Sequence, residues 1–205
     1  MTNDDTPSRR PPSPWRGRLL LLALAAGFAA PLIGAWWLLD HLQHGGRLWG
    51  TVNHGRLVTP PRALEAFELT AADGSPVGAA DLRGHWTLLW AVPSPCTQDC
   101  LATLHLLQQV WLALGREAPR VRRWLLLEGP PEPAVSAWLE RQPGSRAVLD
   151  PEGRLRGPLA EAGGGKPVIG IVDPLGNLME VFDPAADPRG LLQDLRRLLK
   201  ASKIG

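Results

Sequence analysis

Trp86-Thr-Leu-Leu-Trp-Ala-Val-Pro-Ser-Pro-Cys96-Thr-Gln-Asp-Cys100 is the stretch that decides the fold of this 205-residue chain. An apolar run ends in a Pro-Ser-Pro turn, and the only two cysteines of the chain follow at once. Residues 101–114 then have the apolar spacing of a helix. This order places thiols at a helix N-terminus, where backbone N–H groups and the helix dipole favour the thiolate. The stretch therefore predicts a reactive cysteine site.

The spacing of Cys96 and Cys100 allows two kinds of chemistry. On one helix face their Cα atoms would lie about 6 Å apart, which is within disulfide range. For redox work, Cys96 would be the exposed attacking thiol and Cys100 the resolving one. The same pair suits one soft ion such as Cu(I), whereas zinc would need about four ligands. An inert bridge is the alternative, although so short a loop constrains the unfolded chain little.

The N-terminal part of the chain carries a candidate membrane anchor. Residues 19–39 contain no charge and are flanked by Arg18 and Asp40. As a helix they would span about 31 Å, against a hydrocarbon core of about 30 Å. Trp36 and Trp37 fit an aromatic anchor at the membrane interface. A cleaved signal peptide is the alternative, but its apolar core would be shorter, so we favour an uncleaved transmembrane helix.

Charge predicts the orientation of the chain and argues against nucleic-acid binding. Four arginines precede the apolar run, and the first lysine or arginine after it is Arg47. The positive-inside rule therefore predicts a cytoplasmic N-terminus and, in a bacterium, a single-pass inner-membrane protein with a periplasmic C-terminal domain. Four of the 22 basic and two of the 20 acidic residues precede position 40, which leaves 18 of each in residues 40–205. A formally neutral domain gives no electrostatic case for nucleic acid.

We expect four segments along the chain. Residues 1–18 form a disordered cytoplasmic tail, and residues 19–39 the transmembrane anchor. Residues 40–62, which contain Gly45-Gly46 and Pro60-Pro61, form a juxtamembrane linker. Residues 63–205 form the folded domain, which is long enough to bury a core of its own.

Hydrophobic periodicity in the domain predicts alternating strands and helices, followed by a late hairpin. Strands are expected at 67–70, 86–92, 121–127, 146–149, 168–172 and 178–182, and helices at 97–115, 134–141, 155–162 and 188 to about 202. The alternation indicates parallel strand pairs, and the hairpin adds antiparallel ones. The fold class is therefore α/β, a mixed sheet with helices on both faces.

Four motifs resemble the thioredoxin-like SCO/SenC family: Phe67-x-Leu, Asp73-Gly74, Leu82-Arg-Gly84-x-Trp86-x-Leu-Leu, and Cys96-x-x-x-Cys100. The resemblance covers roughly residues 63–202 and includes the N-terminal anchor. It implies a thioredoxin-like fold and a role in delivering copper to, or reducing, the copper sites of cytochrome oxidase. The implied partners are an oxidase subunit or another assembly factor. The three-residue spacing singles out this family, because the usual thioredoxin-like reductases have C-x-x-C.

Two departures from the family pattern bear on copper. Leu101 stands where the family generally has a proline after its second cysteine. The family's copper site also uses a histidine just before the strand of the late hairpin. This chain has no histidine after His105, and the corresponding loop reads Gly165-Lys166-Pro167-Val168. The distal copper ligand that the resemblance implies is therefore missing, and the chain resembles a divergent, SCO-like protein.

The missing histidine leaves the third copper ligand open. The candidates are His105, His85, Met179 or a partner protein. His105 is expected on the helix surface, facing away from the cysteines. By the resemblance, Pro167 follows a cis peptide bond and lies against the thiols, where Lys166 would lend positive charge to a thiolate.

These observations lead to one main hypothesis. The protein is a membrane-anchored thioredoxin-like protein that assists assembly or copper-site maturation of cytochrome c oxidase. It acts by thiol–disulfide exchange at Cys96 and Cys100, by transient Cu(I) binding at the same residues, or by both. Such a protein resembles a metallochaperone more than a turnover enzyme. The alternatives are a non-catalytic scaffold and a general periplasmic thiol–disulfide oxidoreductase.

Overall fold

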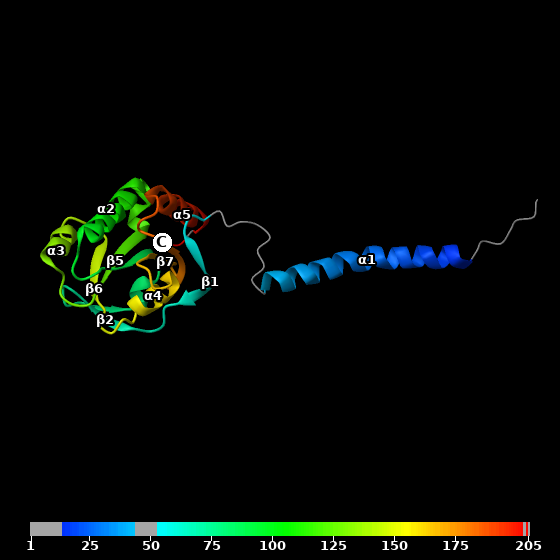
Figure 1. Cartoon of the computed structure of the whole chain (residues 1–205), viewed down its shortest axis with the longest axis horizontal. Helices are drawn as coiled ribbons and strands as arrows, with labels where there is room; N and C mark the ends of the chain where they lie inside the picture. The colour runs from blue at the N-terminus through cyan, green and yellow to red at the C-terminus, as the bar shows by residue number, and fades with distance from the viewer. Residues whose placement is uncertain (1–13, 44–52, 203, 205) are drawn as a thin grey trace, which may run out of the picture. The chain divides into compact units, whose positions relative to one another are not determined.

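The computed structural model describes residues 14–43, 53–202 and 204 (Figure 1). The chain divides into two units, residues 1–51 and 52–205. In the first unit, helix α1 (Pro14–Gln43) contains a segment, Gly17–Asp40, with a mean hydropathy of 2.1. Within the described ranges it is the one helix that is long and apolar enough to cross a membrane. The expected anchor lies inside it, whereas most of the expected tail lies outside the described residues.

The second unit is built on one eight-stranded sheet of order β1-β8-β7-β4-β5-β6-β2-β3. The strands are β1 (Arg56–Ala63), β2 (Glu68–Ala71), β3 (Pro76–Gly78), β4 (Trp86–Ala91), β5 (Val121–Leu127), β6 (Ser145–Leu149), β7 (Ile169–Val172) and β8 (Asn177–Phe182). Strands β4, β5 and β6 pair in parallel, and the other pairs are antiparallel. The predicted mixed sheet is confirmed.

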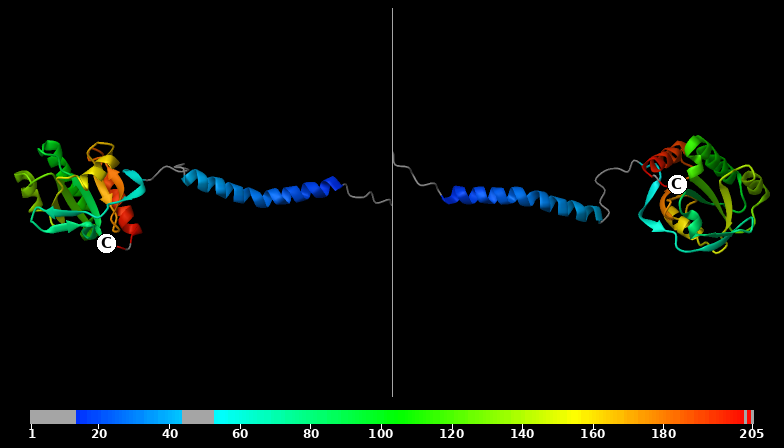
Figure 2. Two further views of the ribbon diagram at one scale, coloured as in Figure 1. Left: turned by 90° about the horizontal axis from the view of Figure 1, so that it is seen from below. Right: turned by 180° about the vertical axis from the view of Figure 1, so that it is seen from behind.

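Helices cover both faces of this sheet, as predicted. They are α2 (Gln98–Ala113), α3 (Pro133–Leu139), α4 (Arg156–Gly163) and α5 (Pro188–Ala201), with short 3₁₀ turns at Ala79–Leu82 and Gly115–Arg120. Helices α2 and α5 lie side by side on one face, which Figures 1 and 2 both show. Helix α3 packs its Val135 into the same apolar cluster, whereas α4 packs Leu159 into the cluster on the opposite face.

The burial of strand β4 on both faces explains the apolar run that predicted it. Trp86, Leu88 and Trp90 point into the cluster beneath α2. Leu89, between them, points into the other cluster. Side chains alternate across a strand, so a strand with helices on both faces must be apolar throughout. The continuous apolar run of this strand therefore reflects its central place in the sheet.

The N-terminal edge of the sheet differs from the sequence expectation. Residues 56–62, expected in the linker, form most of β1, which pairs with β8. Pro60 and Pro61 argue against a strand, but an edge strand tolerates proline because only one of its sides has a neighbour. The pairing register shifts between Leu57 and Arg62, the segment that holds both prolines.

Two buried carboxyl groups fasten the start of this unit to β8 and α5. Asp194 of α5 accepts hydrogen bonds from the backbone N–H groups of His54 (2.7 Å) and Gly55 (3.0 Å), and its Oδ1 lies 3.1 Å from His54 Nδ1. Glu180 of β8 accepts a hydrogen bond from Asn53 Nδ2 at 3.3 Å. A Cβ atom at position 55 would overlap the Glu180 carboxyl group, so this close approach requires glycine.

The pKa values of these two carboxyl groups shift in opposite directions. Burial, together with the neighbouring Asp194, raises the pKa of Glu180 to about 7. Burial alone would also raise the pKa of Asp194, but the hydrogen bonds from His54 and Gly55 outweigh it and lower that pKa. The pair therefore carries one proton at mildly acidic pH, and Glu180 holds it.

Candidate functional site: a disulfide at the start of helix α2

Cys96 and Cys100 form a disulfide with a Cα–Cα distance of 5.2 Å. Cys100 is the third residue of α2, as the sequence suggested, but Cys96 lies in the loop before the helix. Thr97 takes an extended conformation (φ −83°, ψ −175°) and is the N-cap residue, so the helix begins only at Gln98. The expectation that both cysteines lie on one helix face is therefore wrong, although their separation still allows the bridge.

The two cysteines differ in exposure. Cys100 is 1% exposed and belongs to the apolar cluster beneath α2. Cys96 is only partly buried and packs against the edge of that cluster. A second protein would therefore reach the sulfur of Cys96 first. The roles of attacking and resolving thiol stay predictions.

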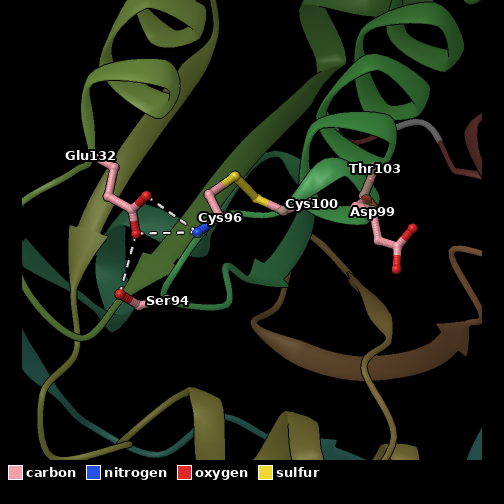
Figure 3. Close-up of a disulfide and its surroundings, with 6 residues drawn as sticks. All are labelled: Ser94, Cys96, Asp99, Cys100, Thr103 and Glu132. Atoms are coloured by element: carbon pink, nitrogen blue, oxygen red, sulfur yellow. Dashed lines mark hydrogen bonds between the residues drawn. A yellow bond between two sulfur atoms is a disulfide. The ribbon is translucent and has the colours of Figure 1, made fainter.

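Glu132 is a site residue that the sequence reasoning missed. Both of its carboxylate oxygens accept a hydrogen bond from the backbone N–H of Cys96 at 3.2 Å, and Oε1 also accepts one from Ser94 Oγ at 3.2 Å (Figure 3). Glu132 precedes α3 and lies 36 positions after Cys96. No local sequence motif links the two residues, so nothing in the pattern indicated this contact.

Sheet topology explains why distant segments meet here. Strand β4 runs parallel to β5 and antiparallel to β7. The loops after β4 and β5 and the loop before β7 therefore all lie at one edge of the sheet. These loops carry Cys96, Glu132 and Lys166, respectively.

A groove of about 900 Å³ runs beside Cys100. It is bounded by α2, by residues 165–168 before β7 and by the loop after β8. Its lining is mostly apolar and includes the charged or titratable residues Asp99, His105, Arg156, Lys166 and Asp183. Lys166 and Pro167 therefore line the same groove as Cys100, and the expectation that they lie against the thiols stays a prediction.

The peptide bond before Pro167 is trans, so this chain lacks the cis bond that the family resemblance implies at this position. In the described part of the chain, the cis bonds precede Pro60 and Pro95 instead. Before Lys166, Gly164 and Gly165 both have left-handed φ angles, 65° and 79°. Gly164 is the C-cap residue of α4, so these left-handed glycines end that helix before the loop.

The candidate third copper ligands are not gathered around the cysteines. His105 lies exposed on α2 and lines the groove. His85 lies at the other end of β4, where its Nε2 is 3.2 Å from Arg122 Nη2. Met179 packs against the apolar cluster from β8. Within the described ranges, no group of three or more His, Cys, Asp or Glu residues could hold a metal ion. The soft donors of this site are its two sulfurs, which suit Cu(I) once reduced.

A buried arginine connects α2 and α3 near their C-terminal ends. Arg123 of β5 lies over the ring of Trp111 in α2 (4.5 Å) and near that of Trp138 in α3 (5.6 Å). It donates to Gln142 Oε1 at 3.2 Å and to the carbonyl of Pro143 at 2.6 Å, and burial lowers its pKa to about 10. It therefore links α2 and α3 at the ends that lie away from the cysteines.

The solved structures that resemble this chain include several Sco proteins. Apo Sco1 from Thermus thermophilus has 19% identity and a TM-score of 0.58, with 73% of this chain and 99% of that one covered. Copper-bound yeast Sco1 has 15% identity and a TM-score of 0.55, covering 69% and 91%. BsSco, described as a member of the Sco family of cytochrome c oxidase assembly proteins, has 13% identity and a TM-score of 0.55, covering 72% and 99%. At these identities the likeness shows a shared fold, which confirms the fold that the sequence resemblance implied.

The sequence itself matches one family model. No curated protein matches the chain. The model for the transmembrane-like, thioredoxin-like C-terminal domain matches residues 86–202, which is more than half of the chain and includes both cysteines. The chain therefore belongs to the family of transmembrane-like, thioredoxin-like C-terminal domains.

Proposed function

We propose that this protein is a single-pass membrane protein that performs thiol–disulfide exchange through Cys96 and Cys100. The observation that carries the proposal is the disulfide at the start of α2, with Cys100 buried and Cys96 within reach of a second protein. Thioredoxin-like proteins use such a pair, because one sulfur attacks and the other resolves the intermediate.

The exchange runs through a mixed disulfide. In the reduced protein, the Cys96 thiolate attacks a client disulfide and releases one client thiolate. The Cys100 thiol then loses its proton to solvent, attacks the Cys96 sulfur and releases the second client thiolate, which restores the Cys96–Cys100 disulfide. Two electrons pass from the cysteine pair to the client. A reducing dithiol protein must then reduce the pair for another cycle.

The groove beside Cys100 supports this function. Its apolar lining and its volume of about 900 Å³ suit an extended segment of a client protein that presents its cysteine to Cys96. The segment would lie between α2 and the Lys166–Pro167 loop.

The sequence supports a specific setting for this chemistry. Helix α1 is apolar enough to cross a bacterial inner membrane, and the arginines before it favour a periplasmic position for the cysteines. By the SCO/SenC resemblance and the shared fold, the client is a cytochrome c oxidase subunit or another assembly factor during copper-site maturation. Cu(I) is then a cargo that the reduced sulfurs hold briefly, with the client supplying a further ligand.

The exchange can be tested by trapping its intermediate. Full-length protein in detergent micelles is reduced, freed of reductant and mixed with a synthetic peptide that contains one disulfide. We expect the wild type to oxidise, Cys100→Ser to accumulate a mixed disulfide with the peptide, and Cys96→Ser to accumulate none, as intact-protein mass spectrometry would show. A wild type that does not oxidise, or a trap that forms only through Cys100, would contradict the proposed exchange.

The Cu(I) step has its own measurement. Reduced full-length protein is titrated with Cu(I) against a chelator under anaerobic conditions. We expect Cys96→Ser to bind Cu(I) at least tenfold more weakly than the wild type, which corresponds to about 1.4 kcal/mol or more. Equal affinities would exclude the copper step and leave the exchange reaction unaffected. Failure of both experiments would favour the non-catalytic scaffold.

A further inference from the structure

We propose that Glu132 is a positioning residue that holds Cys96 ready for bond formation with Cys100 and thereby stabilises the disulfide. The inference rests on the proposed function in one respect, that the cysteine pair cycles between dithiol and disulfide. It assigns a role to a residue from a separate loop, which no sequence motif connects to the cysteines.

The hydrogen bonds of Glu132 are directed at the cysteine loop and not at its own helix. Glu132 is the N-cap residue of α3, but its side chain makes no capping bond there. Both carboxylate oxygens accept instead from the Cys96 N–H at 3.2 Å, and Oε1 also accepts from Ser94 Oγ at 3.2 Å. Figure 3 shows the carboxylate beside the bridge, on the side opposite Asp99. The carboxylate is therefore directed at the cysteine loop, although it stands at the start of α3.

The position of the Cys96 backbone determines where its sulfur can lie. Cys100 is fixed because it belongs to α2 and is buried, with 1% exposure. Cys96 lies outside the helix, so its backbone has no helical hydrogen bonds to hold it. The bonds to Glu132 restrain this loop at the residue whose sulfur must meet that of Cys100.

Restraint of the loop acts differently on the two redox states. In the disulfide, the covalent bridge itself holds Cys96 near Cys100. In the dithiol, only the surrounding contacts do so, and Glu132 supplies bonds to both Ser94 and Cys96. Removing these bonds increases the conformational freedom of the dithiol more than that of the disulfide. The equilibrium between the disulfide and the dithiol then shifts toward the dithiol.

The test is an equilibrium with glutathione. Each disulfide reacts with two glutathione thiols to give two cysteine thiols and one glutathione disulfide, so two electrons enter the protein. Full-length protein in detergent micelles is equilibrated in glutathione buffers without oxygen, and free thiols are counted by mass spectrometry after alkylation. We expect Glu132→Ala to shift this equilibrium about three- to tenfold toward the dithiol, or roughly 15 to 30 mV in reduction potential.

Two further variants separate positioning from charge. Glu132→Gln removes the charge but keeps an oxygen acceptor of similar reach, so it should restore an equilibrium close to that of the wild type. Glu140→Gln removes a charge of the same sign from the exposed C-cap residue of α3, at the opposite end of that helix from Glu132, and should leave the equilibrium within twofold. A Glu132→Ala variant with the wild-type equilibrium, or a Glu132→Gln variant as shifted as the alanine, would overturn the proposal. Because glutathione replaces the client, failure of client exchange would leave this result unaffected.

Discussion

Replacing Asp150 with alanine is expected to lower the free energy of unfolding by about 2 to 4 kcal/mol. Asp150 follows β6 and is completely buried. Its carboxylate accepts hydrogen bonds from the backbone N–H groups of Arg154 (2.6 Å), Leu155 (2.9 Å) and Arg156 (2.8 Å). Alanine would leave these three donors without their acceptor at the start of α4. Urea unfolding of the full-length protein in micelles measures the loss.

The matched control for Asp150 is the N-cap residue of α5. Asp187 is exposed and its side chain accepts one N–H, that of Arg189 at 2.9 Å. Asp187→Ala should therefore cost only about 1 kcal/mol. Loss of these bonds should also let the start of α4 open more often, so Asp150→Ala should speed amide hydrogen exchange in residues 154–168, part of which lines the groove beside Cys100. Equal losses for the two alanine variants would contradict the importance of burial at Asp150.

Replacing Glu180 with glutamine is expected to flatten the dependence of stability on pH between about 5 and 8. Burial and Asp194 raise the pKa of Glu180 from 4.5 to about 7. The folded protein therefore binds this proton more tightly than the unfolded chain does. The resulting stabilisation is fully present below about pH 4.5 and is lost as pH rises through 7, by about 3 kcal/mol at most. Glutamine does not titrate, so the variant should lack this loss.

The opposite shift of Asp194 acts in a different pH window. Its lowered pKa contributes stability above its ordinary value of 3.8, and this stability is lost as the pH falls below it. Unfolding at pH 5, 6, 7 and 8 therefore reports mainly on Glu180. The control is Glu161→Gln, because the Glu161 side chain is 69% exposed at its ion pair with Arg62. A wild type and a Glu180→Gln variant whose stabilities change in parallel over this range would refute the assignment.

The central fold could be predicted because its elements carry their own patterns. Strands β4 and β5 are buried on both faces and appear in the sequence as continuous apolar runs. Helix α5 begins where Asp187 and Pro188 indicate a helix start. The edge strands β1 and β3 lack such a pattern, because they are short or contain proline and exist through pairing with β8 and β2. Their place in the sheet depends on tertiary contacts, which the local sequence does not reveal.

The two cysteines of the candidate site could be predicted from the sequence, but the residues around them could not. Cys96 and Cys100 follow a buried strand within one local motif, so their bridge could be anticipated. Glu132 reaches Cys96 because β4 and β5 pair in parallel, and this pairing cannot be inferred from either segment alone. Glu180 lies within a strand, where an acidic residue would ordinarily indicate a solvent-facing position. It is buried because Asn53 and Asp194, from distant parts of the chain, surround it.

The prolines in the two outermost strands of the sheet bear on whether copies of this domain can pair through their edges. The outermost strands are β1, which contains Pro60 and Pro61, and β3, which begins at Pro76 and is three residues long. Proline lacks the N–H donor that a docking strand needs, so neither margin is a good template for edge-to-edge growth of the sheet. Pairing of two copies of this domain, edge strand to edge strand, is thereby disfavoured.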